Sequence, residues 1–489
     1  MSRKPFVLLL VGALCLALAS AASAQTPSRV SASQKGSLLI FSKIELKWSA
    51  DGQTLLQDTF LDIANDHPDP VRVLGYFING DLELQERCSG EPCTPDNIIQ
   101  EYEPGWNTFD CEFTLTGDQP SFWSAAQGFI GTLGSDGQVI GGFGCGPFTG
   151  LDPGFNEDPP IPGRLDPETN MQTRILRGYA IFWAVRFNDD DFDPGLWEEI
   201  RWNHLKGDAL IVNYENGTAW EYNAWAFQAH AEDNGDSLNE YPGDPPGTLS
   251  LDGLEYDIPF DTLILDFYGT GSTALSGGGQ TVTTDTDLTV HAVSVDVRQD
   301  GCGPVLTKVE ADIWNEFETK FSGTRRCVCC WDQTMLSNWV RSAAIPNHFR
   351  RSALRTDKGK ARLDGVESIE CEYFTLCGET ASLKRRFCDD GNDTAGGGGF
   401  LGESEDASIL GLATKFLSFS PSGDEATAGM NLVGAGEEEA EVRYIARIGP
   451  RDLVDLSGRE GETDVKSAGK VNRTDRNSTV RDVTVTPGE

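Results

Sequence analysis

The sequence predicts an all-β protein made of tandem antiparallel β-sandwiches, with a few short helices and long acidic loops. Three neighbouring segments between residues 36 and 79 carry this prediction, because apolar residues recur in them mostly at every second position. Turn signals separate the segments: Asp51-Gly52 follows the first, and His67-Pro68-Asp69-Pro70 follows the second. A period of two broken by short polar turns is typical of an antiparallel meander.

The first of these segments also indicates which side of the strand is buried. Its apolar residues share one side, and they are Leu38, Ile40, Ile44, Leu46 and Trp48. Lys43, Glu45 and Lys47 point to the other side, which we expect to face solvent in a half-buried strand.

Further strand signals follow along the chain. Residues 109–116 form a short strand candidate, and residues 117–124 read as a turn that brings two aromatic rings over the sandwich edge. Residues 178–187 are largely apolar on both faces. Asn216-Gly217 separates two more strand-like runs and predicts a tight hairpin.

The second half of the chain repeats the order of elements in the first. The motif Asp62-Ile63-Ala64-Asn65-Asp66 has a counterpart in Asp312-Ile313-Trp314-Asn315-Glu316, with the same order of strands and turns around it. This predicts an internal duplication. A change in alternation within residues 287–297 indicates a bulge, and helical spacing predicts short helices at residues 331–341 and 409–417.

Composition and turn signals divide the chain into five regions. These are a signal peptide (1–24), a flexible N-terminus (25–35), β-sandwich units with long loop insertions (36–275), a second related sandwich (281–448) and a disordered tail (449–489). Gly277-Gly278-Gly279 reads as the hinge between the two sandwich regions.

The first 24 residues have the features of an export signal. Arg3 and Lys4 precede an apolar run, and Ala22-Ser23-Ala24 supplies small residues for cleavage after Ala24. No later stretch approaches the roughly 18 apolar residues that span a bilayer, so no transmembrane segment is expected. We therefore expect a secreted, periplasmic or cell-surface protein.

The formal net charge of −37 excludes nucleic acid as a partner, because a phosphate backbone requires a basic surface. Two interpretations remain. The acidic residues keep the protein soluble, or some acidic loops bind a divalent cation such as calcium.

The chain has 12 cysteines, of which Cys15 leaves with the signal. In an exported protein the expected state is disulfides, with one thiol left over. Two local pairings are plausible, Cys88 with Cys93 and Cys111 with Cys145. The remaining candidates are Cys327, Cys330, Cys371, Cys377 and Cys388. Two alternatives remain for the distal cysteines. Four of Cys327, Cys329, Cys330, Cys371, Cys377 and Cys388 form a zinc site, or Cys327, Cys329 and Cys330 take part in redox exchange.

Two sets of residues are candidates for binding a ligand. Asp389, Asp390, Asn392 and Asp393 offer several oxygen ligands for calcium, although a solvated turn is the simpler interpretation. Trp106 and Trp197 lie in loop-like sequence and could stack on a glycan, whereas tryptophans in strands are more often core.

The sequence identifies no catalytic residues. It has five histidines, none of them paired at metal-ligand spacing, and it lacks the HExxH and GxSxG motifs. His204, beside Trp202, reads as a hydrogen-bonded histidine at a strand end rather than a catalytic base. A glycosidase with two carboxylates stays open, because its signature is spatial.

The order LDIAND, VRVLGYF, FTLTGDQPSFWS resembles the immunoglobulin-like sandwich modules of exported bacterial proteins. The resemblance covers residues 36–124 and, more faintly, 287–330, and it implies a fold without an assigned activity. We expect a non-enzymatic structural or adhesive protein of the envelope or extracellular space, with an envelope protein or glycan as partner and no cofactor except calcium. A carbohydrate- or calcium-binding module is the second hypothesis, and an exported glycoside-active enzyme is the third.

Overall fold

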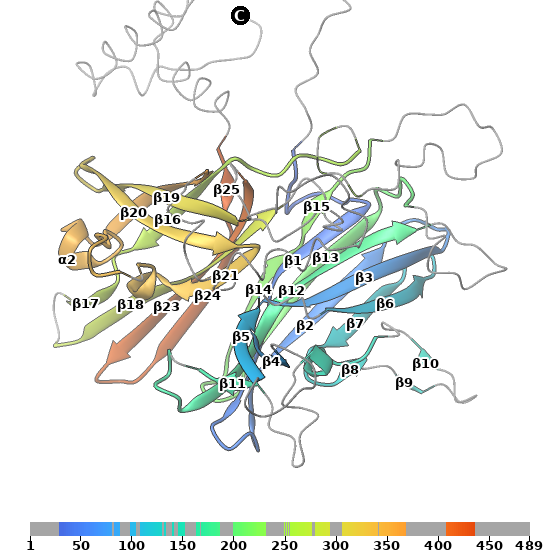
Figure 1. The fold of residues 1–489 in the computed structure, drawn as a ribbon, viewed down its shortest axis with the longest axis horizontal. Helices are drawn as coiled ribbons and strands as arrows, with labels where there is room; N and C mark the ends of the chain where they lie inside the picture. Colours follow the sequence, from blue (N-terminus) through green and yellow to red (C-terminus); the bar gives the residue numbers. More distant parts are fainter. Residues whose placement is uncertain are drawn as a thin grey trace, which may run out of the picture.

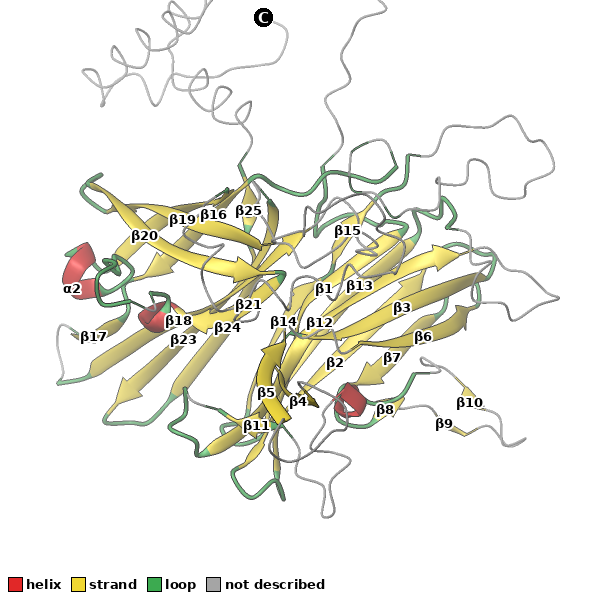
Figure 2. Ribbon diagram, in the orientation of Figure 1, coloured by secondary structure: helices red, strands yellow, loops and turns green. Residues whose placement is uncertain are grey.

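The protein is described from a computed structural model, and nearly every regular element in it is a β-strand (Figures 1 and 2). The structure describes residues 29–80, 83–88, 98–103, 108–129, 132–133, 139–140, 145–151, 163–166, 168–185, 199–230, 249–275 without 250, 252 and 254, 279–293, 306–340, 342–367 and 407–435. The predicted all-β fold is confirmed. Among the described residues, no helix has the length and apolar character needed to cross a membrane.

The first sandwich has an inner sheet and an outer sheet, which are continuous through a short pairing of β1 with β2. The inner sheet contains, in spatial order, β15 (Trp225–Phe227), β1 (Leu38–Ser49), β12 (Thr173–Val185), β3 (Val71–Asn79) and β6 (Thr108–Leu115), with β11 (Arg164–Leu165) beside β12. The outer sheet contains β14 (Thr218–Asn223), β13 (Leu205–Asn213), β2 (Leu55–Asn65), β7 (Pro120–Ser124) and β8 (Gly128–Phe129). Small additions are the pairs β4 (Glu83–Cys88) with β5 (Ile98–Glu103) and β9 (Thr132–Leu133) with β10 (Val139–Ile140), and the 3-10 turn η2 (Phe148–Leu151).

The second sandwich has the same two-sheet plan. Its inner sheet contains β17 (Gly271–Ala274) and β21 (Trp331–Met335) beside β18 (Thr281–Val293), followed by β23 (Ser408–Ser420) and β24 (Glu425–Asn431). Its outer sheet contains β20 (Lys320–Cys329), β19 (Leu306–Asn315), β22 (Lys358–Val366), β16 (Thr262–Tyr268) and β25 (Val433–Gly434). The helical elements here are the 3-10 turn η5 (Leu336–Asn338) and the single-turn α2 (Arg351–Leu354).

Three apolar cores hold these layers together. One fills each sandwich, and the third lies between the two inner sheets, where Ile40, Tyr179 and Trp183 of the first sandwich meet Val293, Trp331 and Leu410 of the second. We call this contact the seam. At the seam, β1, β12 and the adjoining halves of β18 and β23 are therefore buried on both faces, whereas β17 and β24 are largely exposed. The two sandwiches lie against each other (Figure 1).

The seam corrects the predicted orientation of β1. The pairing of β1 with β12 shifts between Phe41 and Ile44, so a bulge inserts one residue there. Before the bulge, Leu38 and Ile40 face the seam; after it, Ile44 faces the core of the first sandwich. The apolar residues that were assigned to one side are thus divided between two cores, because a bulge reverses the alternation.

Two predicted helices are wrong. Residues 331–335 form β21, followed by η5, and residues 408–420 form β23. In β23 the apolar residues lie on two buried faces, which imitates helical spacing. The other run, with Trp331, Met335, Leu336 and Trp339, spans β21, η5 and the residue after it. The pairing of β18 with β23 runs without a shift from Thr281 to Val293, and the rest of the predicted bulge, residues 294–297, lies outside the described residues. The predicted turn at residues 117–124 contains a strand, β7.

The Asn216-Gly217 hairpin is confirmed, with Gly217 at φ +67° between β13 and β14. Two predicted boundaries differ from those in the structure: the start of the second sandwich and the end of the flexible N-terminus. Strands β16 and β17 pair within the second sandwich, so this unit begins before the predicted hinge. Residues 29–35 are held in place rather than flexible, because Val30 is buried in the seam core.

The repeated motif occupies the same kind of position in both sandwiches. Asn65 ends β2 and Asn315 ends β19, both side chains are buried, and each Oδ1 accepts the N–H of the residue two positions on. This agrees with the predicted duplication, while the immunoglobulin-like character stays a prediction.

Candidate functional site

Most residues named from the sequence as ligand or disulfide candidates lie outside the described residues. These are Trp106, Trp197, Asp389, Asp390, Asn392, Asp393, Cys93, Cys371, Cys377 and Cys388. Cys88 ends β4. In the part of the chain that the structure describes, no group of three or more His, Cys, Asp or Glu side chains is arranged to hold a metal ion.

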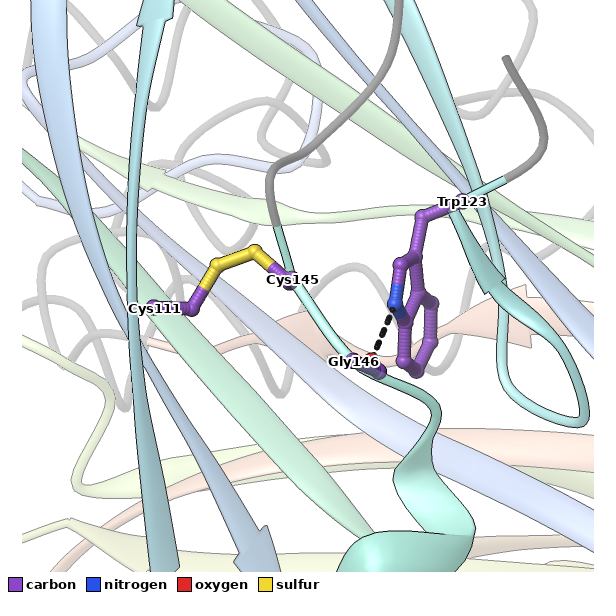
Figure 3. The surroundings of a disulfide bond; sticks show 4 residues. All are labelled: Cys111, Trp123, Cys145 and Gly146. Carbon is purple, nitrogen blue, oxygen red and sulfur yellow. Dashed lines mark hydrogen bonds between the residues drawn. A yellow bond between two sulfur atoms is a disulfide. The ribbon is translucent and has the colours of Figure 1, made fainter.

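One predicted disulfide is present. Cys111 of β6 is bonded to Cys145 across a sequence separation of 34 residues, with 5.3 Å between the Cα atoms (Figure 3). The indole Nε1 of Trp123 donates a hydrogen bond to the carbonyl oxygen of Gly146 at 3.0 Å. Both contacts hold the segment that begins at Cys145 against the first core. Cys327 is also disulfide-bonded, and Cys330 is buried.

The most enclosed charged cluster lies in the seam, around Lys43 of β1. Its ammonium contacts a carboxylate oxygen of Asp287 of β18 at 2.5 Å and one of Glu45 at 3.4 Å. The Nε2 of Gln333 of β21 donates to both carboxylates, and Lys47 pairs with Glu45 at 2.9 Å. The side chains of Lys43, Glu45 and Asp287 are 6% exposed or less. The alternation in the sequence predicted that Lys43 and Glu45 face solvent, but they lie between the sandwiches because the second inner sheet covers them.

This seam cluster is built to hold the sandwiches together rather than to bind a ligand. Burial acts to raise the pKa of Glu45, but the ammonium groups of Lys43 and Lys47, with the Gln333 amide, hold that pKa well below its usual range. Burial lowers the pKa of the neighbouring seam residue His291 to about 3, so this ring is neutral. The charges therefore balance one another inside the protein.

The outer sheet of the first sandwich has a different surface, which we take as the candidate functional site. Strand pairing places Leu210 of β13 opposite Phe60 of β2, and Phe122 of β7 opposite Asp62 of β2. The rings of Phe60 and Phe122 stack with centroids 5.3 Å apart and planes 10° from parallel. Leu210 is 38% exposed and Phe122 is 37% exposed. Together Leu210, Phe60 and Phe122 form an apolar strip across three strands.

Two aspartates stand beside this strip. Asp62 of β2 and Asp208 of β13 are directly opposite each other, and like charges in that position destabilise a sheet. Burial, followed by the charge of Asp208, raises the pKa of Asp62 to about 6, although Lys206 partly offsets the shift. Burial also raises the pKa of Asp208. Near pH 6 the pair can therefore both accept and donate hydrogen bonds. We call the apolar strip with these aspartates the outer-face site.

The sequence contained only part of the signal for the outer-face site. Phe60 and Asp62 lie in a recognisable strand, but Phe122 was assigned to a turn, and Asp208 is remote in the sequence. Only the register of β13, β2 and β7 brings these residues together. His204, at the start of β13, has its Nδ1 3.1 Å from a carboxylate oxygen of Asp66, as expected for a hydrogen-bonded histidine.

Comparisons with known proteins identify no family. A scan against models of protein families finds no match, and no curated protein matches the sequence. The solved structures found include the CupB6 tip adhesin from Pseudomonas aeruginosa, at 7% identity and a TM-score of 0.11, over 83% of this chain and 94% of that chain. A TM-score this low carries no argument, so the assignment of function depends on the site.

Removing one partner of the seam cluster should strongly destabilise the protein. In Asp287→Ala the ammonium of Lys43 stays buried without its closest carboxylate, so the free energy of unfolding should fall by about 3–5 kcal/mol. Urea denaturation of the wild type and of Asp287→Ala measures this loss in the free energy of unfolding. Lys320→Ala removes the more exposed ion pair with Asp312 and should cost less than about 1 kcal/mol. Equal losses in the two variants would show that the seam cluster does not hold the sandwiches together.

The seam should also make the protein sensitive to acid. Because the folded-state pKa of Glu45 is lowered, its contribution to stability is complete above the unfolded value of about 4.3 and is lost as the pH falls through the lower folded value. Glu45→Gln should flatten this part of the stability curve, measured by urea denaturation between about pH 7 and pH 3. The exposed Glu310→Gln is the control and should leave the slope unchanged. Parallel curves for wild type and Glu45→Gln would contradict the role of Glu45.

Asp62 should have the opposite dependence on pH. Its raised pKa means that stability is complete below the unfolded value and is lost as the pH rises through about 6. Asp62→Asn should therefore stabilise the protein above pH 6, by up to about 1 kcal/mol, and give no such gain near pH 4. Thermal melting at both pH values tests this, with Asp424→Asn, in the exposed β23–β24 turn, as the control. A gain that is independent of pH would exclude the carboxylate pair as its cause.

Proposed function

We propose that this chain is an exported, non-enzymatic adhesive protein that contacts its partner through the outer-face site. The observation that carries the proposal is the apolar strip of the exposed Leu210 and Phe122, joined by the half-buried Phe60, on a sheet whose other face is packed against a core. Apolar surface on a folded protein that is contiguous and bordered by polar residues marks an interaction site.

The aspartate pair supports the same surface. A strand pairing that sets Asp62 against Asp208 lowers stability, and perturbed carboxylates of this kind cluster at functional sites. A partner that brings a basic side chain to the pair would relieve the repulsion and bury the strip at the same time. The partner chemistry that fits is a surface with apolar and basic side chains.

The arrangement of the rings favours a protein partner over a glycan. Phe60 and Phe122 stack on each other with nearly parallel planes, so one face of each ring is already covered. A sugar-binding platform offers open ring faces, and the stacking leaves each of these rings at most one such face. The open sheet surface also suits a large partner more than an enclosed small substrate.

Export is supported by the N-terminal signal pattern and by the disulfides at Cys111 and Cys327, since disulfides persist in oxidising compartments. Sequencing the N-terminus of the protein recovered outside the cytoplasm tests this part. The expected first residue is Gln25, and a start at Met1 would overturn the proposed export signal.

The adhesive surface is tested by retention of beads that carry the mature chain on envelope preparations of the producing cell. Phe122→Thr combined with Leu210→Thr should lower retention about tenfold, because losing interface anchors costs roughly 1–2 kcal/mol. Phe317→Ser is the matched control, since Phe317 is 77% exposed but lies in the second sandwich, at the β19–β20 turn. Melting temperatures confirm folding. Equal retention of wild type and double variant would overturn the proposal.

A further inference from the structure

A pocket of about 580 Å³ that is lined mainly by polar residue types opens at one end of the second sandwich, away from the outer-face site. Strands β17 and β18 form one wall, and the segment that leads through η5 to α2 forms the other. Its volume lies within the range of roughly 300–1,000 Å³ that is usual for small-molecule sites. Its lining residues include six with a hydroxyl group and two arginines, although apolar atoms of these residues supply the larger share of the surface.

Backbone hydrogen bonds fix the two walls against each other. The N–H of Thr270 donates to the carbonyl of Phe349 at 2.9 Å, and the N–H of Arg351 donates to the carbonyl of Thr270 at 3.0 Å. Gly271 follows at φ +130°, a conformation that other residues rarely adopt. The only atom near a Cβ built there is the Cβ of Arg351 at 3.9 Å, so the backbone leaves this part of the pocket open. The arginines are therefore held in place by the fold.

The arginine wall favours an anionic group. Arg350 donates one hydrogen bond, from Nη2 to the carbonyl of Ser337 at 3.0 Å, which uses one of its five N–H donors. Arg351 pairs with Asp357. The surrounding segment, residues 306–366, has eleven Lys or Arg and seven Asp or Glu, whereas the whole chain has a charge of −37. This locally basic region attracts anions in an otherwise acidic protein.

The opposite wall of the pocket, formed by β17 and β18, favours a ligand that carries hydroxyl groups. The hydroxyls of Ser272 and Thr283 are 2.7 Å apart and can each donate and accept. Asp285 uses Oδ1 to accept the N–H groups of Thr286 at 2.8 Å and Ser337 at 3.3 Å. Its carboxylate is a hydrogen-bond acceptor within the pocket and also disfavours a doubly charged ligand such as phosphate. The ligand chemistry that satisfies both walls is a single carboxylate together with several hydroxyls.

We propose that this pocket binds an acidic saccharide, a sugar ring that carries one carboxylate. The carboxylate lies against Arg350, and the sugar hydroxyls bond to Ser272, Thr283 and Asp285. This site lies on the second sandwich and goes beyond the proposed adhesive contact. Saccharide binding at this pocket can therefore be present or absent whether or not the outer-face site binds its partner.

The test is titration calorimetry of the mature chain with galacturonate, galactose and acetate. Galacturonate should bind, and galactose and acetate should each bind at least about tenfold more weakly, because each satisfies only one wall. Arg350→Gln should weaken galacturonate about tenfold, and Ser272→Ala should weaken it by a smaller factor. Arg362→Gln, on the outer face of β22, is the control and should bind as wild type does.

Three results would overturn the proposal. Equal binding of acetate and galacturonate identifies a simple anion site, equal binding of galactose shows that the arginine wall has no role, and no galacturonate binding shows that the pocket is not a saccharide site. Melting temperatures of the variants establish that they are folded. Loss of binding in Phe122→Thr would instead connect the pocket to the outer-face site and contradict their independence.

Discussion

The structure depends on the burial of charge in the seam. Lys43, Glu45 and Asp287 lie between two sheets, where an unpaired charge is very costly, and they are acceptable only because each contacts an opposite charge from the same cluster. Two of these residues belong to β1 and one to β18, so separating the sandwiches would expose the apolar seam and break the pairing together. The two sandwiches therefore behave as one unit.

This constraint explains why the solvent-facing sheet surfaces differ from the inner ones. Since β1 and β12 have cores on both faces, the first sandwich offers the strand surface of its outer sheet to a partner. The apolar strip and its aspartates lie on the outer sheet of the first sandwich, while the second sandwich offers a pocket at its end. A rigid unit with two separate polar and apolar surfaces can bind two different partners without changing shape.

The alternating pattern predicted the fold class well and the burial of each face poorly. Strand formation depends on local side-chain alternation, so β1, β2, β3 and the Asn216-Gly217 hairpin follow from the sequence. The environment of Lys43 depends on β18 and β21, which are more than 200 residues away, and no local pattern reports such a contact. Strand β23 resembled a helix because both of its faces are buried, which removes the polar side that identifies a strand. The other predicted helix joined apolar residues of β21 and η5 into one run.

Prediction of the sites from the sequence was limited for the same reason, because local patterns do not report contacts between distant segments. Cys111 and Cys145 were identified because pairing of nearby cysteines is a local inference, whereas Asp62 and Asp208 meet through a register that only the folded sheet defines. The roles of Trp106, Trp197 and the Asp389–Asp393 loop stay predictions.

The pairing of β18 with β23 has a mechanical consequence. Thirteen residues of β18 are matched in register by an antiparallel partner. When tension pulls these strands in opposite directions along their axes, the load is shared by the whole ladder, and many hydrogen bonds must break at once before either strand slides. Peeling the strands from one end would break the bonds one by one and needs far less tension. The direction of pull therefore decides how long the second sandwich stays intact.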